Sequence, residues 1–304
     1  MTVINTLVCN QEIGFMSADE MGSNQARDGY RTDKIVDTSA PGVHAVSGGS
    51  GSSNTLKLVL DQHRTKSDSV FAVAQTFAQA INQHKHDVIG GVLQGKYGLP
   101  EAAYQQGSLQ LPNREATNAN KIFEEYNQMV EVSNHPIREE VQAYVLTLGF
   151  DEQIQVYRSA WMSTHPTKIG IPWATIGSGQ DFSDAVLGEY ISKLSPKQRT
   201  NIDVLEGLET IVRATNKSMA NPGVGGRVRL AVVNPEQTLF VDENNSNYAA
   251  LAVRAHDQGL LKQEQLHGFL DRLVLQEEDY KTVRQELDAH AQKNGYHLAE
   301  LATR

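Results

Sequence analysis

The chain has 304 residues, of which 39% are hydrophobic and 21% charged, a composition typical of globular proteins and unlike that of disordered ones. Its formal net charge of −9 argues against a general affinity for DNA or RNA, because phosphate binding needs a positive surface. No apolar run approaches the roughly 20 residues of a membrane-spanning helix, so no membrane span is expected.

Two short β-prone segments open the chain, and the sequence predicts that they pair as a hairpin. Residues 2–9 and 13–19 are separated by the polar residues 10–12, which are typical of a turn. The single cysteine, Cys9, cannot form an internal disulfide, which favours a reducing cytoplasm. Its apolar strand context indicates a buried, inert thiol and not a nucleophile. The N-terminus has no basic region followed by an apolar stretch, so no signal peptide is expected.

The next segment alternates short strands with polar stretches. A polar loop at 21–33 leads to Lys34 and to a strand that begins KIV, and VHAV forms a fourth strand. The run SGGSGSSNT at 47–55 then predicts a loop that leads into a helix and presents backbone N–H groups to an anion. Three interpretations stay open. The loop could bind a phosphate, although it lacks the Gly-Lys-Ser/Thr ending of a P-loop; it could stabilise an oxyanion; or it could simply enter the helix.

The middle of the chain predicts helices around an irregular insert. An amphipathic helix is expected at 67–83, with Ser67 as its N-cap. The triplet HKH at 84–86 has neither the spacing of a helix face nor that of a metal site, so it indicates a solvated helix end. Residues 87–120 lack sustained periodicity and are long for a connection. A short helix at about 118–131 is expected after them.

The second half of the chain returns to strands. EVQAYVLTLGF and QIQVYRSAW predict two strands joined at residues 151–152, and a loop leads to IPWATIGSGQDFSDAVLGEYI. There a Gly-Ser-Gly turn centred on Ser178 feeds a helix, for which a simple N-cap is the alternative role. A further helix is expected at 203–219, and VGGRVRLAVV forms the last strand.

The residues after Pro235 are polar and helix-prone. Helices are expected at about 247–258, 262–275 and 277–293. An apolar stripe in the second of them indicates packing against the body or a neighbouring subunit, and comprises Leu266, Phe269, Leu270 and Leu273.

Thr2 carries the most suggestive chemistry in the chain. If Met1 is removed, as a small second residue generally allows, Thr2 has a hydroxyl and a free α-amine. That amine has a reference pKa of about 7.7–8.0, so near neutral pH it can accept the proton of the hydroxyl. Asp19 closes the strand IGFMSAD, and Lys34 lies in RTDKIVD.

Together these residues resemble the proteasome β-type peptidases of the N-terminal nucleophile (Ntn) hydrolases, including the peptidase subunit of the bacterial two-component ATP-dependent protease. Lys34 and Gly48 fall at the family's offsets from the N-terminal Thr, and Asp19 falls one residue late. Ser178 matches a Ser that assists the nucleophile. The resemblance covers roughly residues 2–83 and 140–234.

The resemblance implies a fold and an organisation. The fold would be α+β, a four-layer αββα sandwich with a helical C-terminal extension. Residues 1–235 would form the proteasome-like domain, with an insert at about 87–138, and residues 236–304 the extension. One departure stands out. Asn221 and Val224 occupy positions where the family usually has Asp and Ser, and Asn can form hydrogen bonds but cannot carry the charge.

The resemblance also implies a function, that of an N-terminal threonine endopeptidase. Thr2 would be the nucleophile, and Lys34 would lower the pKa of its hydroxyl and amine. Asp19 would hold Lys34, the Gly48 N–H would meet the oxyanion, and Ser178 would assist Thr2. No cofactor or metal is implied.

The partners implied are a peptide or unfolded protein as substrate and an ATPase unfoldase, with the site inside a cytoplasmic homo-oligomeric ring. Neither nucleic acid nor a membrane is expected as a partner. Two alternatives stay open: a non-catalytic ring-forming subunit, and an amidase of the same fold that acts on a small substrate.

Overall fold

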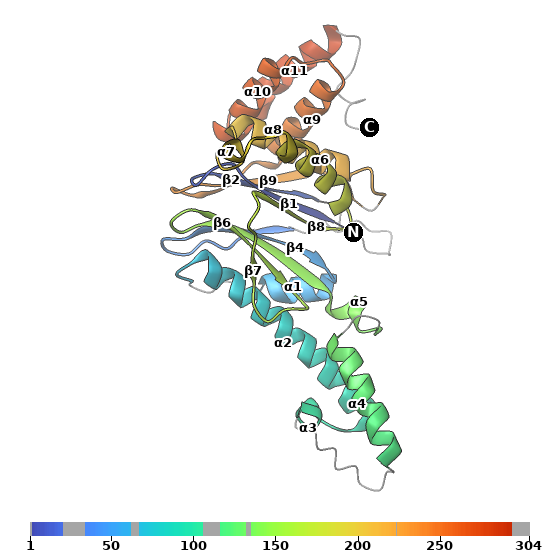
Figure 1. The fold of residues 1–304 in the computed structure, drawn as a ribbon. Helices are drawn as coiled ribbons and strands as arrows, with labels where there is room; N and C mark the ends of the chain where they lie inside the picture. The colour runs from blue at the N-terminus through green and yellow to red at the C-terminus, as the bar shows by residue number, and fades with distance from the viewer. Residues whose placement is uncertain are drawn as a thin grey trace.

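The computed structural model describes most of the chain, namely residues 2–20, 34–61, 67–105, 116–131, 135–222 and 224–293. Within these residues the strands form two antiparallel sheets that face each other, and helices cover the outer face of each sheet (Figure 1). The protein is therefore a mixed α/β structure built in layers. None of the described helices is long and apolar enough to cross a membrane.

The first sheet has the strand order β10-β9-β2-β1-β8. Its strands are β1 (Val3–Val8), β2 (Gly14–Asp19), β8 (Trp173–Gly177), β9 (Val228–Val233) and β10 (Thr238–Phe240). The predicted hairpin between β1 and β2 is confirmed, and the Asn10 side chain accepts the N–H groups of Glu12 and Ile13 in its turn. β1 lies between β2 and β8, so its first residues are flanked on both sides by strand ends.

The second sheet has the order β3-β4-β5-β6-β7. Its strands are β3 (Ile35–Asp37), β4 (His44–Gly51), β5 (Ala143–Phe150), β6 (Ile154–Ala160) and β7 (Thr167–Lys168). The prediction of a Gly/Ser loop at 47–55 is wrong, because β4 continues to Gly51 and helix α1 (Ser53–Asp61) begins two residues later. β4 pairs with β3 and along its whole length with β5, and this pairing outweighs the low strand preference of its glycines.

An apolar core fills the space between the two sheets. It joins residues of both sheets, among them Ile4, Met16, Val46, Leu146 and Leu148. A second core lies on the outer face of the first sheet, beneath helices α6 (Gln180–Lys193) and α8 (Val204–Ser218). Helices α1 and α2 (Val70–Tyr97) cover the other sheet. Helix α7 (Pro196–Arg199) connects α6 to α8.

Helix α2 is much longer than the sequence predicts. Its N-cap is Ser69 and not Ser67, and it ends only at Gly98, whose φ of 70° closes the helix. A buried stripe with a spacing of four residues continues through Ile81, Lys85, Ile89 and Leu93. Lys85 is therefore buried inside a helix, so the expected solvated helix end at 84–86 is also wrong. Packing along this stripe outweighs the cost of about 1 kcal/mol for each glycine in a helix.

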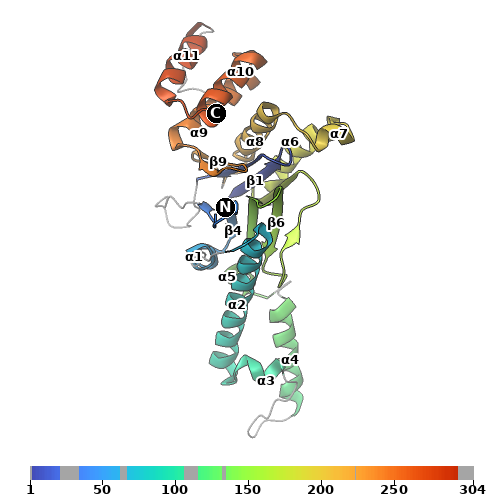
Figure 2. The ribbon, with the colours of Figure 1, turned by 90° about the vertical axis from the view of Figure 1, so that its left-hand side faces the viewer.

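The far half of α2 forms an arm with two further helices, α3 (Glu101–Gln105) and α4 (Ala116–Glu131), and Figure 2 shows the arm extending away from the sheets. We call it the α2–α4 arm. The short helix α5 (Arg138–Val141) returns the chain to β5. Within the arm, His86 Nδ1 lies 2.7 Å from a Glu101 oxygen and Lys96 forms an ion pair with Glu125 at 2.6 Å. The expected short helix near 118–131 is confirmed, and α2 and α3 occupy part of the segment expected to be irregular.

The C-terminal helices pack on the body of the same chain. They are α9 (Glu243–Asp257), α10 (Gln263–Leu270), which continues as a π-helical turn (Asp271–Leu275), and α11 (Tyr280–Lys293). The predicted apolar stripe of α10 is buried in the same core as α6 and α8. Residue 235 lies in the turn between β9 and β10, so the expected boundary falls within the first sheet.

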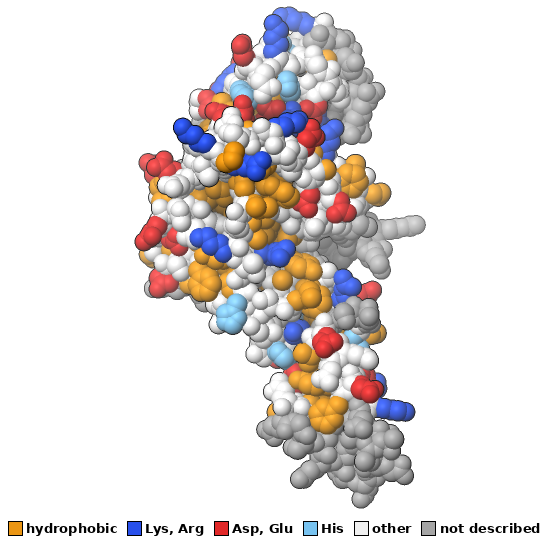
Figure 3. Space-filling model, in the orientation of Figure 1, with side chains coloured by type: hydrophobic (Ala, Val, Ile, Leu, Met, Phe, Trp, Pro, Cys, Tyr) orange, Lys and Arg blue, Asp and Glu red, His pale blue; other side chains and the backbone are white. Residues whose placement is uncertain are grey.

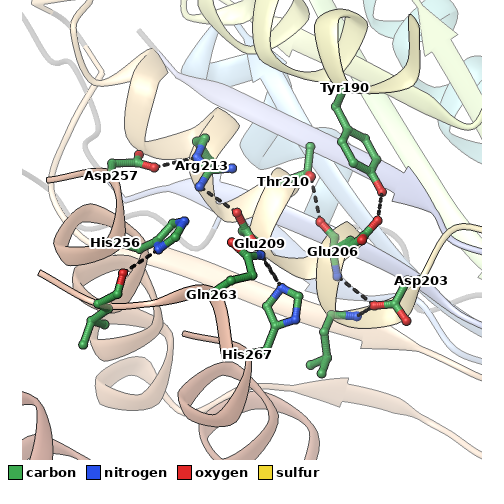
Figure 4. A network of polar contacts seen from close by, with 12 residues as sticks. Tyr190, Asp203, Glu206, Glu209, Thr210, Arg213, His256, Asp257, Gln263 and His267 are labelled. Atoms are coloured by element: carbon green, nitrogen blue, oxygen red, sulfur yellow. Dashed lines mark hydrogen bonds and ion pairs between the residues drawn. The ribbon is translucent and has the colours of Figure 1, made fainter. Parts of the chain in front are cut away.

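A polar seam joins α8 to α9 and α10 (Figure 4). The buried Glu209 carboxylate receives Arg213 at 2.6 Å and lies 2.9 Å from His267 Nε2. Gln263 donates to the same carboxylate, and Arg213 also donates to Asp257 at 2.8 Å. These side chains come from three helices, so the seam fixes how the C-terminal helices sit on the body.

Candidate active site

Thr2 lies at the open end of β1, where two neighbouring strands meet it. The Val3 N–H donates to the side chain of Asp19 at the end of β2, and Val3 pairs with Gly177 at the end of β8. Thr2 is thus held between a strand end that carries a carboxylate and the turn that carries Ser178. Its side chain is largely buried, with 7% of its surface exposed.

The Asp19 carboxylate is the centre of the site. Its Oδ1 accepts hydrogen bonds from Thr2 Oγ1 at 2.9 Å, the Val3 N–H at 2.8 Å and Lys34 Nζ at 2.8 Å. Its Oδ2 accepts the N–H of Gly225 at 3.1 Å. Asp19 has no exposed surface, and four donors compensate for the removal of its charge from water.

Lys34 reaches Asp19 from the other sheet. It directly precedes β3, and its carbonyl accepts the Gly49 N–H at 3.1 Å, which ties its backbone to β4. Burial lowers the pKa of the Lys34 ammonium, and the negative charge of Asp19 opposes that shift. The ion pair therefore links the two sheets directly beside the Thr2 hydroxyl.

Ser178 contacts the backbone of Thr2. Its hydroxyl accepts the Thr2 N–H at 3.1 Å and lies 3.4 Å from the Thr2 carbonyl, to which Gly179 N–H also donates. Gly177 has φ of 106°, and a side chain there would approach the Thr2 carbonyl oxygen to 2.2 Å. The N-cap of α6 is Gly179, so the alternative role of Ser178 as the N-cap does not hold.

Among the predicted site residues, Gly48 is the one that makes no hydrogen bond to Thr2 or Asp19 within the described part of the chain. In an antiparallel strand the N–H groups of successive residues point to alternate sides. Because the Gly49 N–H donates toward β3, the Gly48 N–H is directed toward β5, where Gly48 pairs with Leu146. A Cβ on Gly48 would lie 2.8 Å from Ile4, which places this residue against the core between the sheets.

Two further residues support the site: Gly225, which is not among the predicted site residues, and Asn221, which the sequence marks only as a departure from the family's pattern. The Gly225 N–H binds Asp19, and the Asn221 side chain donates to the Ser178 carbonyl at 2.7 Å. The only sequence feature that marks the contact between Gly225 and Asp19 is the Gly-Gly pair before the last strand. Val224 is buried beside Gly179 and contributes no polar group to the site.

The assembled groups are of the kinds that can take part in acyl transfer. A hydroxyl, a buried cation and a backbone nitrogen lie together around one carboxylate, which is an arrangement able to ionise and orient a nucleophile. Across the described residues, no three His, Cys, Asp or Glu side chains gather as a metal site would require.

Comparisons with known proteins bear on the fold. No family model and no curated protein matches the sequence. Among solved structures the chain is similar to Anbu, named as an ancestral beta-subunit, from Yersinia bercovieri. The TM-score is 0.54 at 10% identity, and the match covers 85% of this chain and 94% of that one. At this identity the likeness supports a proteasome-like fold and no more.

Proposed function

We propose that this protein is an N-terminal threonine hydrolase of the proteasome type, with Thr2 as its nucleophile after removal of Met1. The observation that carries the proposal is the convergence of Thr2 Oγ1 and Lys34 Nζ on one oxygen of the buried Asp19. A threonine buried only for packing would not need a buried ion pair beside its hydroxyl. The layered sheets support assignment to the αββα sandwich of the Ntn hydrolases, with residues 236–304 as its helical extension.

The reaction would begin at Thr2. With Met1 removed, the nitrogen that lies 3.1 Å from the Ser178 hydroxyl is a free amine. It would accept the proton of the Thr2 hydroxyl while that oxygen attacks a peptide carbonyl. The positive charge of Lys34 favours the deprotonated hydroxyl and the neutral amine. Asp19 orients both Thr2 and Lys34, and water then releases the acyl group.

The proposed substrate is a peptide or an unfolded protein, which is cleaved inside a homo-oligomeric ring. An ATPase would deliver the unfolded substrate to that ring. The similar structure is named a subunit, which supports an assembly. Large apolar side chains are also exposed, among them Met162, Ile171 and Phe182. Surfaces of this kind often mark contacts between subunits.

A non-catalytic subunit of the same fold is the second candidate. Asn221 and Val224 favour it, because neither can supply the charge or hydroxyl that the resemblance places there. Asn221 instead uses its amide to hold the Ser178 carbonyl. Such a subunit would keep the Thr2–Asp19–Lys34 contacts as structure and would not turn over peptides.

Substitution at Thr2 distinguishes the two candidates. Thr2→Ala should reduce hydrolysis of fluorogenic peptides and unfolded casein to background, whereas Thr2→Ser keeps a hydroxyl and should retain measurable turnover. Alanine, serine and threonine are all small, so removal of Met1 should be the same in the three chains. Equal activity in the parent and the Ala variant would end the proposal that Thr2 is the nucleophile. A folded parent chain with no activity would favour the non-catalytic subunit.

A further inference from the structure

A hydrolase of this kind needs a hydrogen-bond donor for the oxyanion, and the chain does not offer the Gly48 amide. Attack by Thr2 moves the carbonyl π electrons onto oxygen, and donors near that oxygen stabilise the charge. The Gly48 N–H is directed toward β5, as the alternation from Gly49 requires. Another group beside Thr2 must therefore meet the oxyanion.

Ser50 lies close to the backbone of Thr2. It is two residues beyond Gly48 on β4, so its side chain lies on the face that Gly48 turns toward the first sheet. A Cβ on Gly177 would lie 3.1 Å from Ser50 Oγ and 2.2 Å from the Thr2 carbonyl oxygen. The Ser50 hydroxyl and Thr2 thus adjoin the same glycine from opposite sheets.

The Ser50 hydroxyl is also uncommitted. Ser50 is 6% exposed, and its hydroxyl makes no hydrogen bond within the described part of the chain. Nearby hydroxyls are used structurally: Ser47 contacts Thr38 and Thr147 at 3.1 and 3.0 Å. A nearly buried hydroxyl beside Thr2 that keeps its proton free can donate to a bound ligand.

We propose that Ser50 donates the hydrogen bond that stabilises the oxyanion during acyl transfer to Thr2. This inference rests on the proposed function. As Thr2 Oγ1 bonds to the carbonyl carbon, its proton passes to the Thr2 amine and the carbonyl oxygen takes the electron pair. Ser50 Oγ–H donates to that oxygen and keeps its proton. The C–N bond then breaks, and the amine of Thr2 returns the proton to the leaving nitrogen.

Kinetics of Ser50→Ala give the first test. Removal of one oxyanion donor typically costs on the order of 10²–10³ in kcat, so kcat should fall by that factor with little change in KM. Ser50→Thr keeps the hydroxyl and should recover much of the loss. Ser53→Ala, on the exposed start of α1, is the matched control and should behave like the parent.

Two inhibitors separate a donor from a structural residue. A peptide aldehyde forms a tetrahedral adduct with an oxyanion, whereas a peptide vinyl sulfone is attacked at a carbon–carbon double bond and forms none. Ser50→Ala should bind the aldehyde far more weakly and react with the vinyl sulfone at the parent rate. Retained vinyl sulfone labelling also reports that the variant's Thr2 site is folded.

The other outcomes overturn the proposal. Unchanged kcat and aldehyde affinity in Ser50→Ala would exclude Ser50 as the donor while leaving Thr2 as the nucleophile. Equal loss with both inhibitors would assign Ser50 a structural role. If neither inhibitor labels Thr2 in the parent chain, the proposed function fails and the role of Ser50 fails with it.

Discussion

At the scale of single residues, Asp19 holds the site together more than Thr2 does. Its two oxygens accept four donors from three parts of the chain: the first residues of β1, Lys34 and the segment before β9. A buried carboxylate that keeps three donors tolerates the loss of the fourth better than a buried ammonium tolerates the loss of the carboxylate hydrogen-bonded to it. The two partners of the ion pair should therefore differ in what their substitution costs.

Asp19→Asn should lower the free energy of unfolding by about 3–5 kcal/mol, because it removes the negative charge hydrogen-bonded to the buried Lys34 ammonium and turns one acceptor into a donor. Lys34→Met should cost less, since Asp19 keeps the Thr2 hydroxyl and two backbone N–H groups. Both variants should lose peptide turnover. Urea unfolding and peptide assays measure the two effects.

Asp37→Asn at the end of β3 is a suitable control for that comparison. Asp37 is exposed and accepts the Ser39 N–H at 2.9 Å, which the asparagine side chain can also accept. The free energy of unfolding of Asp37→Asn should equal that of the parent chain. If Lys34→Met lost more free energy of unfolding than Asp19→Asn, the view that the carboxylate tolerates the loss of its partner better than the ammonium does would be contradicted.

At the scale of elements, the polar seam between α8 and the C-terminal helices makes a pH-dependent contribution. Burial raises the pKa of Glu209, but His267 and Arg213 outweigh it and hold the pKa below its usual range. The folded-state pKa is thus below that of the unfolded chain, about 4.3. The stabilisation is fully present above that pH and is lost as the pH falls through the folded value.

Glu209→Gln should therefore lower the free energy of unfolding at neutral pH by about 1.5–3 kcal/mol, the range for hydrogen bonds to charged groups. The difference from the parent should shrink below a pH of about 4.3. Glu189→Gln, an exposed ion-pair partner of Lys193, should have little effect at any pH. If Glu209→Gln lowered the free energy of unfolding by the same amount at pH 3 and at pH 7, this charge contribution would be ruled out.

Some of the elements can be predicted from the sequence, and others cannot. The β1–β2 hairpin, β5, β6, α8 and the C-terminal helices follow from local pattern and turn residues. The resemblance to the proteasome β-type peptidases points to Thr2, Asp19, Lys34 and Ser178, and the structure brings these residues together. What local pattern could not give is structure made by distant partners, such as the extension of α2 against α4 and the pairing of Gly48 with β5.

At the scale of the whole molecule, the exposed apolar side chains support an assembly. Figure 3 shows such side chains gathered across the middle of one face. Light scattering should give a particle several times the 33.5 kDa of one chain. Ile171→Lys should lower that mass, whereas Glu264→Lys, on the exposed side of α10, should not. A 33.5 kDa particle at all physiological concentrations would reject the ring and favour an amidase acting on a small substrate.

Intact-mass spectrometry of the purified chain, before and after treatment with a peptide vinyl sulfone, shows whether Thr2 is the nucleophile. We expect a chain that lacks Met1 and gains one adduct, which peptide mapping locates on Thr2 and which Thr2→Ala abolishes. A chain that retains Met1 and gains no adduct would contradict this role of Thr2, as would an adduct that persists in Thr2→Ala.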